Sequence, residues 1–200
     1  VLTSDGSGVL SGMNSGFGGA LNLISTQTAS NSASVSFTSG LDSTYDVYCF
    51  KFIEINPASQ SSFQFQTSTN SGSSYGVTVT STYFRGQHTE AGSAGALGYQ
   101  STLDIAQGTG DQILLHDQSA DADSGGAGEL YLFAPSSTTY IKHFYSRNVN
   151  FSPSGSYQAY IFDAYIGGYF NTTTAIDAII FRCSTGNFDG TIKLYGISKS

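Results

Sequence analysis

The residue types that could do chemistry gather most densely in one short acidic stretch. It reads Asp121-Ala122-Asp123-Ser124-Gly125-Gly126 and copies the first, third and sixth positions of a helix-loop-helix calcium site. Gly125 stands at the fifth position, which needs an oxygen side chain, and Leu132 stands at the twelfth, which needs a bidentate carboxylate. We therefore interpret the stretch as a solvated turn. The alternative is an irregular calcium cage completed by Asp117 and Glu129.

The three histidines do not form a catalytic pattern with the many serines. A triad of the α/β-hydrolase kind needs Gly-x-Ser-x-Gly at a strand-to-helix turn, and no such context is found. We expect His88 and His116 at strand ends and His143 within a strand, as surface or interface residues rather than general bases. A glycosidase would need two carboxylates aimed at one cleft, whereas most acids here fall in turns. The sequence predicts no enzyme, no catalytic residue, no metal and no cofactor.

The two cysteines, Cys49 and Cys183, both lie inside apolar runs. We interpret them as buried free thiols that act as small hydrophobic side chains. A disulfide between them would need facing strands and stays open at this point. Zinc is not expected, because no histidine stands at ligand spacing to either cysteine.

Aromatic residues offer a different chemistry, the recognition of a sugar or of a protein surface. The chain has 13 Tyr and 14 Phe but no Trp, whose absence weakens the case for sugar stacking. Tyr157, Tyr160, Tyr165 and Tyr169 cluster around Gly167-Gly168 and are the candidate contact patch. Carbohydrate binding is therefore kept as the alternative to a purely structural role.

Composition and charge exclude several classes of protein. Only 10% of the 200 residues are charged, against about 25% in an ordinary soluble domain, while 39% are hydrophobic. This combination excludes intrinsic disorder and a coiled coil. The net charge of −7 and the absence of a basic cluster argue against nucleic-acid binding. No apolar stretch is long enough for a transmembrane helix, so we expect no membrane insertion.

The elements that must position these residues are strands, because apolar and polar residues alternate along most of the chain. The longest candidate, 45–55, is apolar on both faces and should lie centrally in a sheet. In the candidate 62–67, Phe63 and Phe65 should point inward and Gln64 and Gln66 outward. The other candidates are 32–38, 75–85, 113–115, 130–133, 140–145, 157–166, 176–183 and 191–197.

About ten short strands without crossover helices predict an all-β fold, an antiparallel β-sandwich of the jelly-roll kind. Residues 21–200 are expected to form this single domain, and the Gly- and Ser-rich residues 1–20 an arm or linker. Since the sequence begins without Met, we expect it to start inside a longer or processed chain. Two long loops are expected at 86–110 and 117–128, where contacts with other molecules would be sought first.

The polar but uncharged surface suits a subunit that is buried against other copies, because such an interface desolvates few ions. Several segments also resemble virion structural proteins of tailed bacteriophages, especially marine and cyanobacterial phages. The segments are 35–48, 128–133, 175–179 and above all the closing Gly190-Thr191-Ile192-Lys193-Leu194-Tyr195-Gly196-Ile197.

This resemblance covers roughly residues 20–197 and carries over no site residue. It implies a non-enzymatic module of a tail fibre or of a capsid decoration or cement protein, exposed on the virion surface. Its partners would be other virion proteins and copies of itself, with a trimer expected. The alternative is an adhesin that binds a host-receptor glycan.

Overall fold

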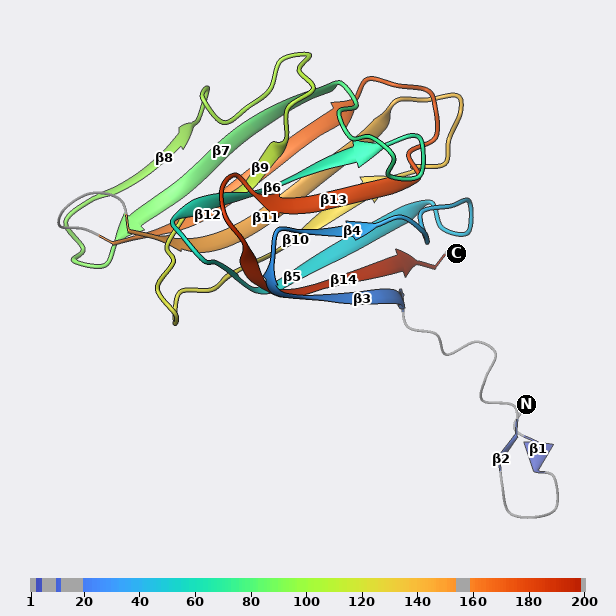
Figure 1. The fold of residues 1–200 in the computed structure, drawn as a ribbon, viewed down its shortest axis with the longest axis horizontal. Helices are drawn as coiled ribbons and strands as arrows, with labels where there is room; N and C mark the ends of the chain where they lie inside the picture. The colour runs from blue at the N-terminus through green and yellow to red at the C-terminus, as the bar shows by residue number, and fades with distance from the viewer. Residues whose placement is uncertain (1–2, 5–9, 12–19, 154–158, 199–200) are drawn as a thin grey trace.

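The computed structural model describes residues 3–4, 10–11, 20–153 and 159–198. This part of the chain contains strands and no helix, and its main strands form two sheets that face one another (Figure 1). Every strand pair is antiparallel. The predicted antiparallel β-sandwich is therefore confirmed, and the strand order is compatible with a jelly roll. No helix long and apolar enough to cross a membrane occurs among the described residues.

The larger sheet has eight strands and the smaller has four. In spatial order the larger contains β3 (Leu21–Ser32), β14 (Phe188–Ile197), β5 (Val47–Pro57), β10 (Gly126–Phe133), β11 (Lys142–Ser152), β12 (Tyr160–Phe170), β7 (Val79–Thr89) and β8 (Gly95–Tyr99). The smaller contains β4 (Ser34–Phe37), β13 (Ala178–Cys183), β6 (Ser61–Ser68) and β9 (Gln112–Gln118). Two short strands, β1 (Thr3–Ser4) and β2 (Leu10–Ser11), pair with each other.

The core between the sheets is built mainly from phenylalanine. Phe63 and Phe65 on β6 are fully buried, as predicted, while Gln64 and Gln66 lie on the opposite face of the strand. Phe181 on β13 contacts five other rings, those of Phe37, Phe50, Phe52, Phe63 and Phe65, at centroid distances of 5.2–6.2 Å. This ring cluster fixes the small sheet against β5.

The strand β5 lies centrally, as predicted, but its alternation changes near its end. A register shift there coincides with a positive φ of 52° at Glu54. The irregularity turns Ile55 into the core while Ile53 stays exposed, so the regular alternation predicted for the strand 45–55 does not hold at its end. Gly190 on β14 lies beside it, and a Cβ there would come within 2.9 Å of the Glu54 carbonyl oxygen. The close approach of the two backbones therefore requires glycine at 190.

Three expectations about strands and loops need correction. The predicted loop 86–110 contains the end of β7 and all of β8, and the predicted loop 117–128 is shortened by β9 and β10. The strand β3, a sheet edge, was not expected. Most of the predicted arm, 1–20, lies outside the described residues.

Candidate functional site

The outward side of the eight-stranded sheet carries a row of large side chains that crosses all eight strands. Strand register places eight residues side by side, and we call them the central row. From β8 to β3 they are Tyr99, Phe84, Tyr165, Arg147, Glu129, Lys51, Lys193 and Thr26. The row is aromatic at the β8 end and ionic in the middle. We call the whole outward side of this sheet the aromatic face.

The rings on the aromatic face stack on one another across neighbouring strands. The planes of Phe84 and Tyr165 differ by 4° and their centroids are 5.1 Å apart. The guanidinium of Arg147, the next residue in the row, lies over the Tyr165 ring, 5.0 Å from its centroid. In the adjacent row Tyr131 and Tyr145 stack at 4.8 Å. These side chains support each other as cross-strand pairs, and several ring faces are already in use.

Ion pairs within the aromatic face neutralise most of its charge. Lys51 donates to the Glu129 carboxylate, and this bond raises the pKa of Lys51. Arg147 forms a two-pronged pair with Asp163, with Nε–Oδ1 and Nη2–Oδ2 distances of 3.1 and 2.9 Å. Lys193 lies opposite Lys51 in the strand register. The strand positions of this face carry the basic residues Lys51, Arg147 and Lys193 and the acids Glu129, Asp163 and, near the start of β14, Asp189. The face is therefore close to neutral, although the chain has a net charge of −7.

Large apolar side chains remain exposed on this face. Phe84 and Tyr145 keep 43% and 47% of their surface accessible, and Leu97 on β8 keeps 76%. Toward the other edge of the sheet, Leu23 on β3 and Ile53 on β5 are exposed as well. An exposed apolar surface of this extent, bordered by polar groups, is typical of a protein–protein contact.

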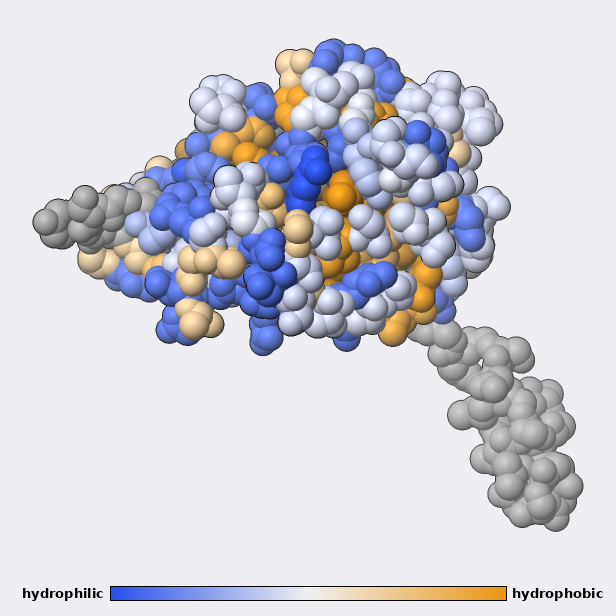
Figure 2. Space-filling view, in the orientation of Figure 1, coloured by the Kyte–Doolittle hydropathy of each residue, from blue (hydrophilic) through white to orange (hydrophobic). Residues whose placement is uncertain are grey.

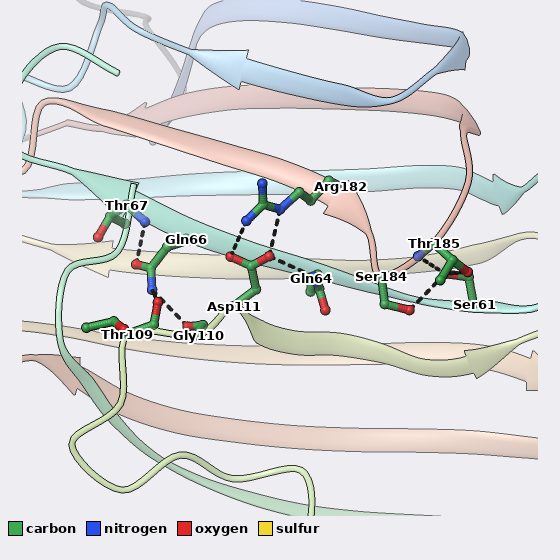
Figure 3. A network of polar contacts seen from close by, with 10 residues as sticks. All are labelled: Ser61, Gln64, Gln66, Thr67, Thr109, Gly110, Asp111, Arg182, Ser184 and Thr185. Atoms are coloured by element: carbon green, nitrogen blue, oxygen red, sulfur yellow. Dashed lines mark hydrogen bonds and ion pairs between the residues drawn. The ribbon is translucent and has the colours of Figure 1, made fainter. Parts of the chain in front are cut away.

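The outward side of the four-stranded sheet is polar, and its side chains form hydrogen bonds with one another and with the nearby backbone. Arg182 binds Asp111 through two hydrogen bonds of 2.7 and 3.0 Å, and Gln64 donates to the same carboxylate at 2.7 Å (Figure 3). Gln66 donates to the Gly110 carbonyl and accepts from the Thr67 amide. In Figure 2, blue and white residues, hydrophilic or intermediate in hydropathy, cover most of the visible surface, with hydrophobic residues in orange showing between them. This side offers few unused groups to a partner.

The predicted tyrosine patch is divided by the strand alternation. Tyr157 lies outside the described residues. Tyr160 is on the inward side of β12, with its ring 5.9 Å from that of Phe162. Tyr165 and Tyr169 alone point outward, and they belong to the aromatic face. The prediction of a single patch around Gly167-Gly168 is therefore wrong, because residues of opposite parity on a strand point to opposite sides.

The acidic stretch forms a turn, as predicted. The Ser124 amide donates to the Asp121 carbonyl at 3.0 Å, and the Asp121 carboxylate accepts from the Ser119 hydroxyl. Asp117 accepts from Ser152, while Glu129 is the partner of Lys51, so neither carboxylate completes a calcium cage. Among the described residues no three His, Cys, Asp or Glu side chains are placed to hold a metal ion.

The histidines lie apart from one another. His88 and His143 are exposed, as predicted. His116 is half-buried between the sheets, so the prediction of a surface position does not hold for it. Arg85 donates to its Nδ1 at 2.8 Å, and the Arg85 guanidinium lies 3.8 Å from the centre of the Phe162 ring. Burial and the charge of Arg85 lower the pKa of His116. A neutral histidine bound to an arginine has no carboxylate or serine partner of the kind that a triad needs.

The cysteines are free and buried, as predicted, and they do not pair. Cys183 belongs to the core between the sheets, where burial raises the pKa of its thiol to about 11. Cys49 points to the other side of the large sheet, beneath the aromatic face, and burial raises its pKa too. Neither thiol is activated as a nucleophile.

The aromatic face was missed by sequence reasoning, although one signal for it exists. On β10 and β11 the aromatic residues Tyr131, Phe133 and Tyr145 occupy the positions that alternate with the buried ones. Comparison of the chain with protein-family models, with curated proteins and with solved structures finds no significant match. The aromatic face is therefore interpreted from its own chemistry.

Proposed function

We propose that this chain is a non-enzymatic structural module that assembles with other protein subunits through the aromatic face. The observation that carries the proposal is the central row, in which exposed rings stack beside ion pairs that are already neutralised. Such a surface can be buried against a protein at a low cost in desolvated charge. A multi-copy component of a virion surface, in a tail fibre or a capsid decoration, agrees with this chemistry and with the resemblance described above. The trimer and the position on the particle stay predictions.

The test uses the lysines of the aromatic face in the native assembly. Lys51 and Lys193 lie on this face, whereas Lys142 is fully buried. Lysine-directed cross-linking of the intact assembly, followed by mass spectrometry, is expected to join Lys51 or Lys193 to other subunits. The double variant Phe84→Ser with Tyr165→Ser should fail to be incorporated. The matched variant Gln64→Ser on the four-stranded sheet should be incorporated normally. Incorporation of the double variant at wild-type levels would exclude the proposal.

Glycan binding is the second candidate, and one hollow favours it. A depression of about 240 Å³ beside β7 is lined by Gly86, His88, Ala96, Ile161 and Asp163, among others. It combines an apolar floor with a carboxylate and an imidazole, as a sugar site does. The stacking of Phe84 on Tyr165 argues against it, because a sugar ring needs a free aromatic face.

A glycan array separates the two functions. No saturable binding is expected if the chain is only a structural module. A Cβ at Gly86 meets no atom within 4 Å, so Gly86→Leu fills the hollow without a clash. Saturable glycan binding that Gly86→Leu abolishes would favour the adhesin.

A further inference from the structure

The two edges of the large sheet differ in how much of their backbone is hydrogen-bonded. At one edge, β8 pairs with the second half of β7, and the chain that follows β8 returns along the first half. There the amides of Val79 and Ser81 donate to the carbonyls of Gly108 and Ile105 at 2.7 and 2.8 Å. The Gln100 amide donates to the Tyr83 carbonyl at 2.8 Å. The backbone of β7 is therefore paired along most of its outer side, and the edge strand itself, β8, is only five residues long and offers little backbone for further pairing.

At the other edge, β3 pairs with β14 on one side only. Within the part of the chain that the structure describes, no hydrogen bond outside this ladder involves the backbone of residues 23–29. Because successive residues of a strand direct their amides to alternate sides, about half of these peptide groups point away from β14. They form a row of free donors and acceptors.

The composition of this edge leaves it unprotected against pairing. The edge strands β3 and β4 follow one another along the chain, and residues 21–37 contain no Asp, Glu, Lys, Arg or Pro. Soluble proteins usually place charges or proline on long edge strands to prevent association. In a chain with a net charge of −7, seventeen consecutive residues without charge form a place where two copies can meet without repulsion.

We propose that two copies of this chain pair antiparallel through β3, across a two-fold axis at Gln27. The pairing rests on the proposed structural role and extends it to a second copy. It joins the two large sheets into one continuous sheet, as in strand addition. Since a two-fold axis relates pairs, the unit that forms through this edge is a dimer.

The register follows from the side chains. Residues Ser25–Ala29 pair with β14 without interruption, between two irregularities, and Gln27 is their midpoint. With Gln27 on the axis, Thr26 faces Thr28 of the partner subunit, and both lie on the outward side of the sheet. Opposed threonines are a favourable cross-strand pair. A slip by one residue would place outward residues opposite inward ones, so it is excluded.

Charge exchange at the axis tests the pairing. Gln27 is exposed, so Gln27→Lys and Gln27→Glu are expected to fold normally, as checked by circular dichroism. In each variant two like charges face each other across the axis, which should raise the dissociation constant of the dimer at least about fivefold. An equimolar mixture of the two variants brings Lys opposite Glu and should restore a dimer that contains one copy of each. Analytical ultracentrifugation and native mass spectrometry measure both effects.

The control is Thr82→Lys, an equally exposed strand position on β7, which should leave the dimer unchanged. A wild-type chain that stays monomeric up to its solubility limit would overturn the proposal. So would a mixture of the two Gln27 variants that stays monomeric, or a trimer that neither Gln27 variant weakens, because such a trimer does not form through β3. Each of these results would overturn pairing through β3 and leave the proposed function untouched. The proposed function is tested separately, by incorporation of the Phe84 and Tyr165 double variant into the assembly.

Discussion

The space between the two sheets has two halves that differ in how many polar side chains are buried in them. One half, enclosed by β4, β13, β6, β5 and β14, is filled with stacked and edge-on phenylalanine rings around Phe181. The other half, which we call the polar half, lies where β9 covers β11, β12 and β7. There, buried polar side chains lie among apolar ones such as Leu114, Phe162 and Ile166. On β11 the inward positions after Phe144 are Ser146, Asn148, Asn150 and Ser152, all fully or almost fully buried.

Only some of the buried polar groups in the polar half have a hydrogen-bond partner. Asn150 donates to the His116 carbonyl at 3.0 Å, and Asn148 donates to the Ser146 hydroxyl at 2.8 Å. Among the described residues, the Tyr83 hydroxyl and the side-chain oxygens of Asn148 and Asn150 have no partner. Buried groups of this kind are usually satisfied by internal water. The phenylalanine half therefore stabilises the fold by burial of apolar surface, whereas the polar half depends on directed hydrogen bonds as well.

The largest expected effect comes from the phenylalanine half. Phe181→Ala removes the ring at the centre of the cluster and leaves a cavity, so the free energy of unfolding should fall by about 3–5 kcal/mol. Urea denaturation followed by circular dichroism measures the change. The control is Phe84→Ala on the aromatic face, which should cost less than about 1 kcal/mol, because that ring is 43% exposed. Equal losses in the two variants would contradict the distinction between core and face.

A smaller effect is expected in the polar half. Asn150→Ala removes the donor to the His116 carbonyl and leaves that carbonyl buried with one bond fewer, which should cost about 1–3 kcal/mol. Asn150→Leu tests the nature of the layer, since an apolar side chain would also displace internal water. If the polar half behaves as a hydrogen-bonded layer, the leucine variant is no more stable than wild type. A more stable leucine variant would show that burial alone holds this half together.

The phenylalanine half was accessible to sequence reasoning, and the polar half was not. Phe63 and Phe65 alternate with glutamines, so their direction follows from hydropathy. On β11 the same rule fails, because Val149 and Phe151 point outward while Asn148 and Asn150 point inward. The competing influence is tertiary: β9 covers the asparagines and offers Asn150 a backbone carbonyl, and hydropathy along one strand does not record such a partner.

The edges and the site differed from expectation for related reasons. The strand β3 has few large apolar residues, because an edge strand buries little surface, and β8 consists mainly of Gly, Ala and exposed Leu97. The central row depends on the register between strands far apart in sequence, such as Phe84 on β7 and Tyr165 on β12. One sequence gives the alternation within a strand but not its neighbours.

The smallest expected effect is a dependence of stability on pH that arises in the polar half. Burial and the neighbouring Arg85 lower the pKa of His116 in the folded chain, while Asp117 acts in the opposite direction. In the unfolded chain a histidine titrates near about 6.5. Below that pH the unfolded chain therefore binds more protons than the folded one, and the free energy of unfolding falls as the pH decreases.

The contribution should stay below about 1 kcal/mol between pH 6.5 and 5, because His116 is only half-buried and solvent screens its charge. Urea denaturation at a series of pH values measures it, with His116→Gln as the comparison, since glutamine keeps an acceptor for Arg85 but does not titrate. As the pH falls from about 6.5 to 5, the free energy of unfolding of the wild type should decrease by more than that of the variant. Parallel pH profiles would mean that His116 binds a proton equally well in the folded and in the unfolded chain, and would show that Arg85 and burial do not lower its pKa.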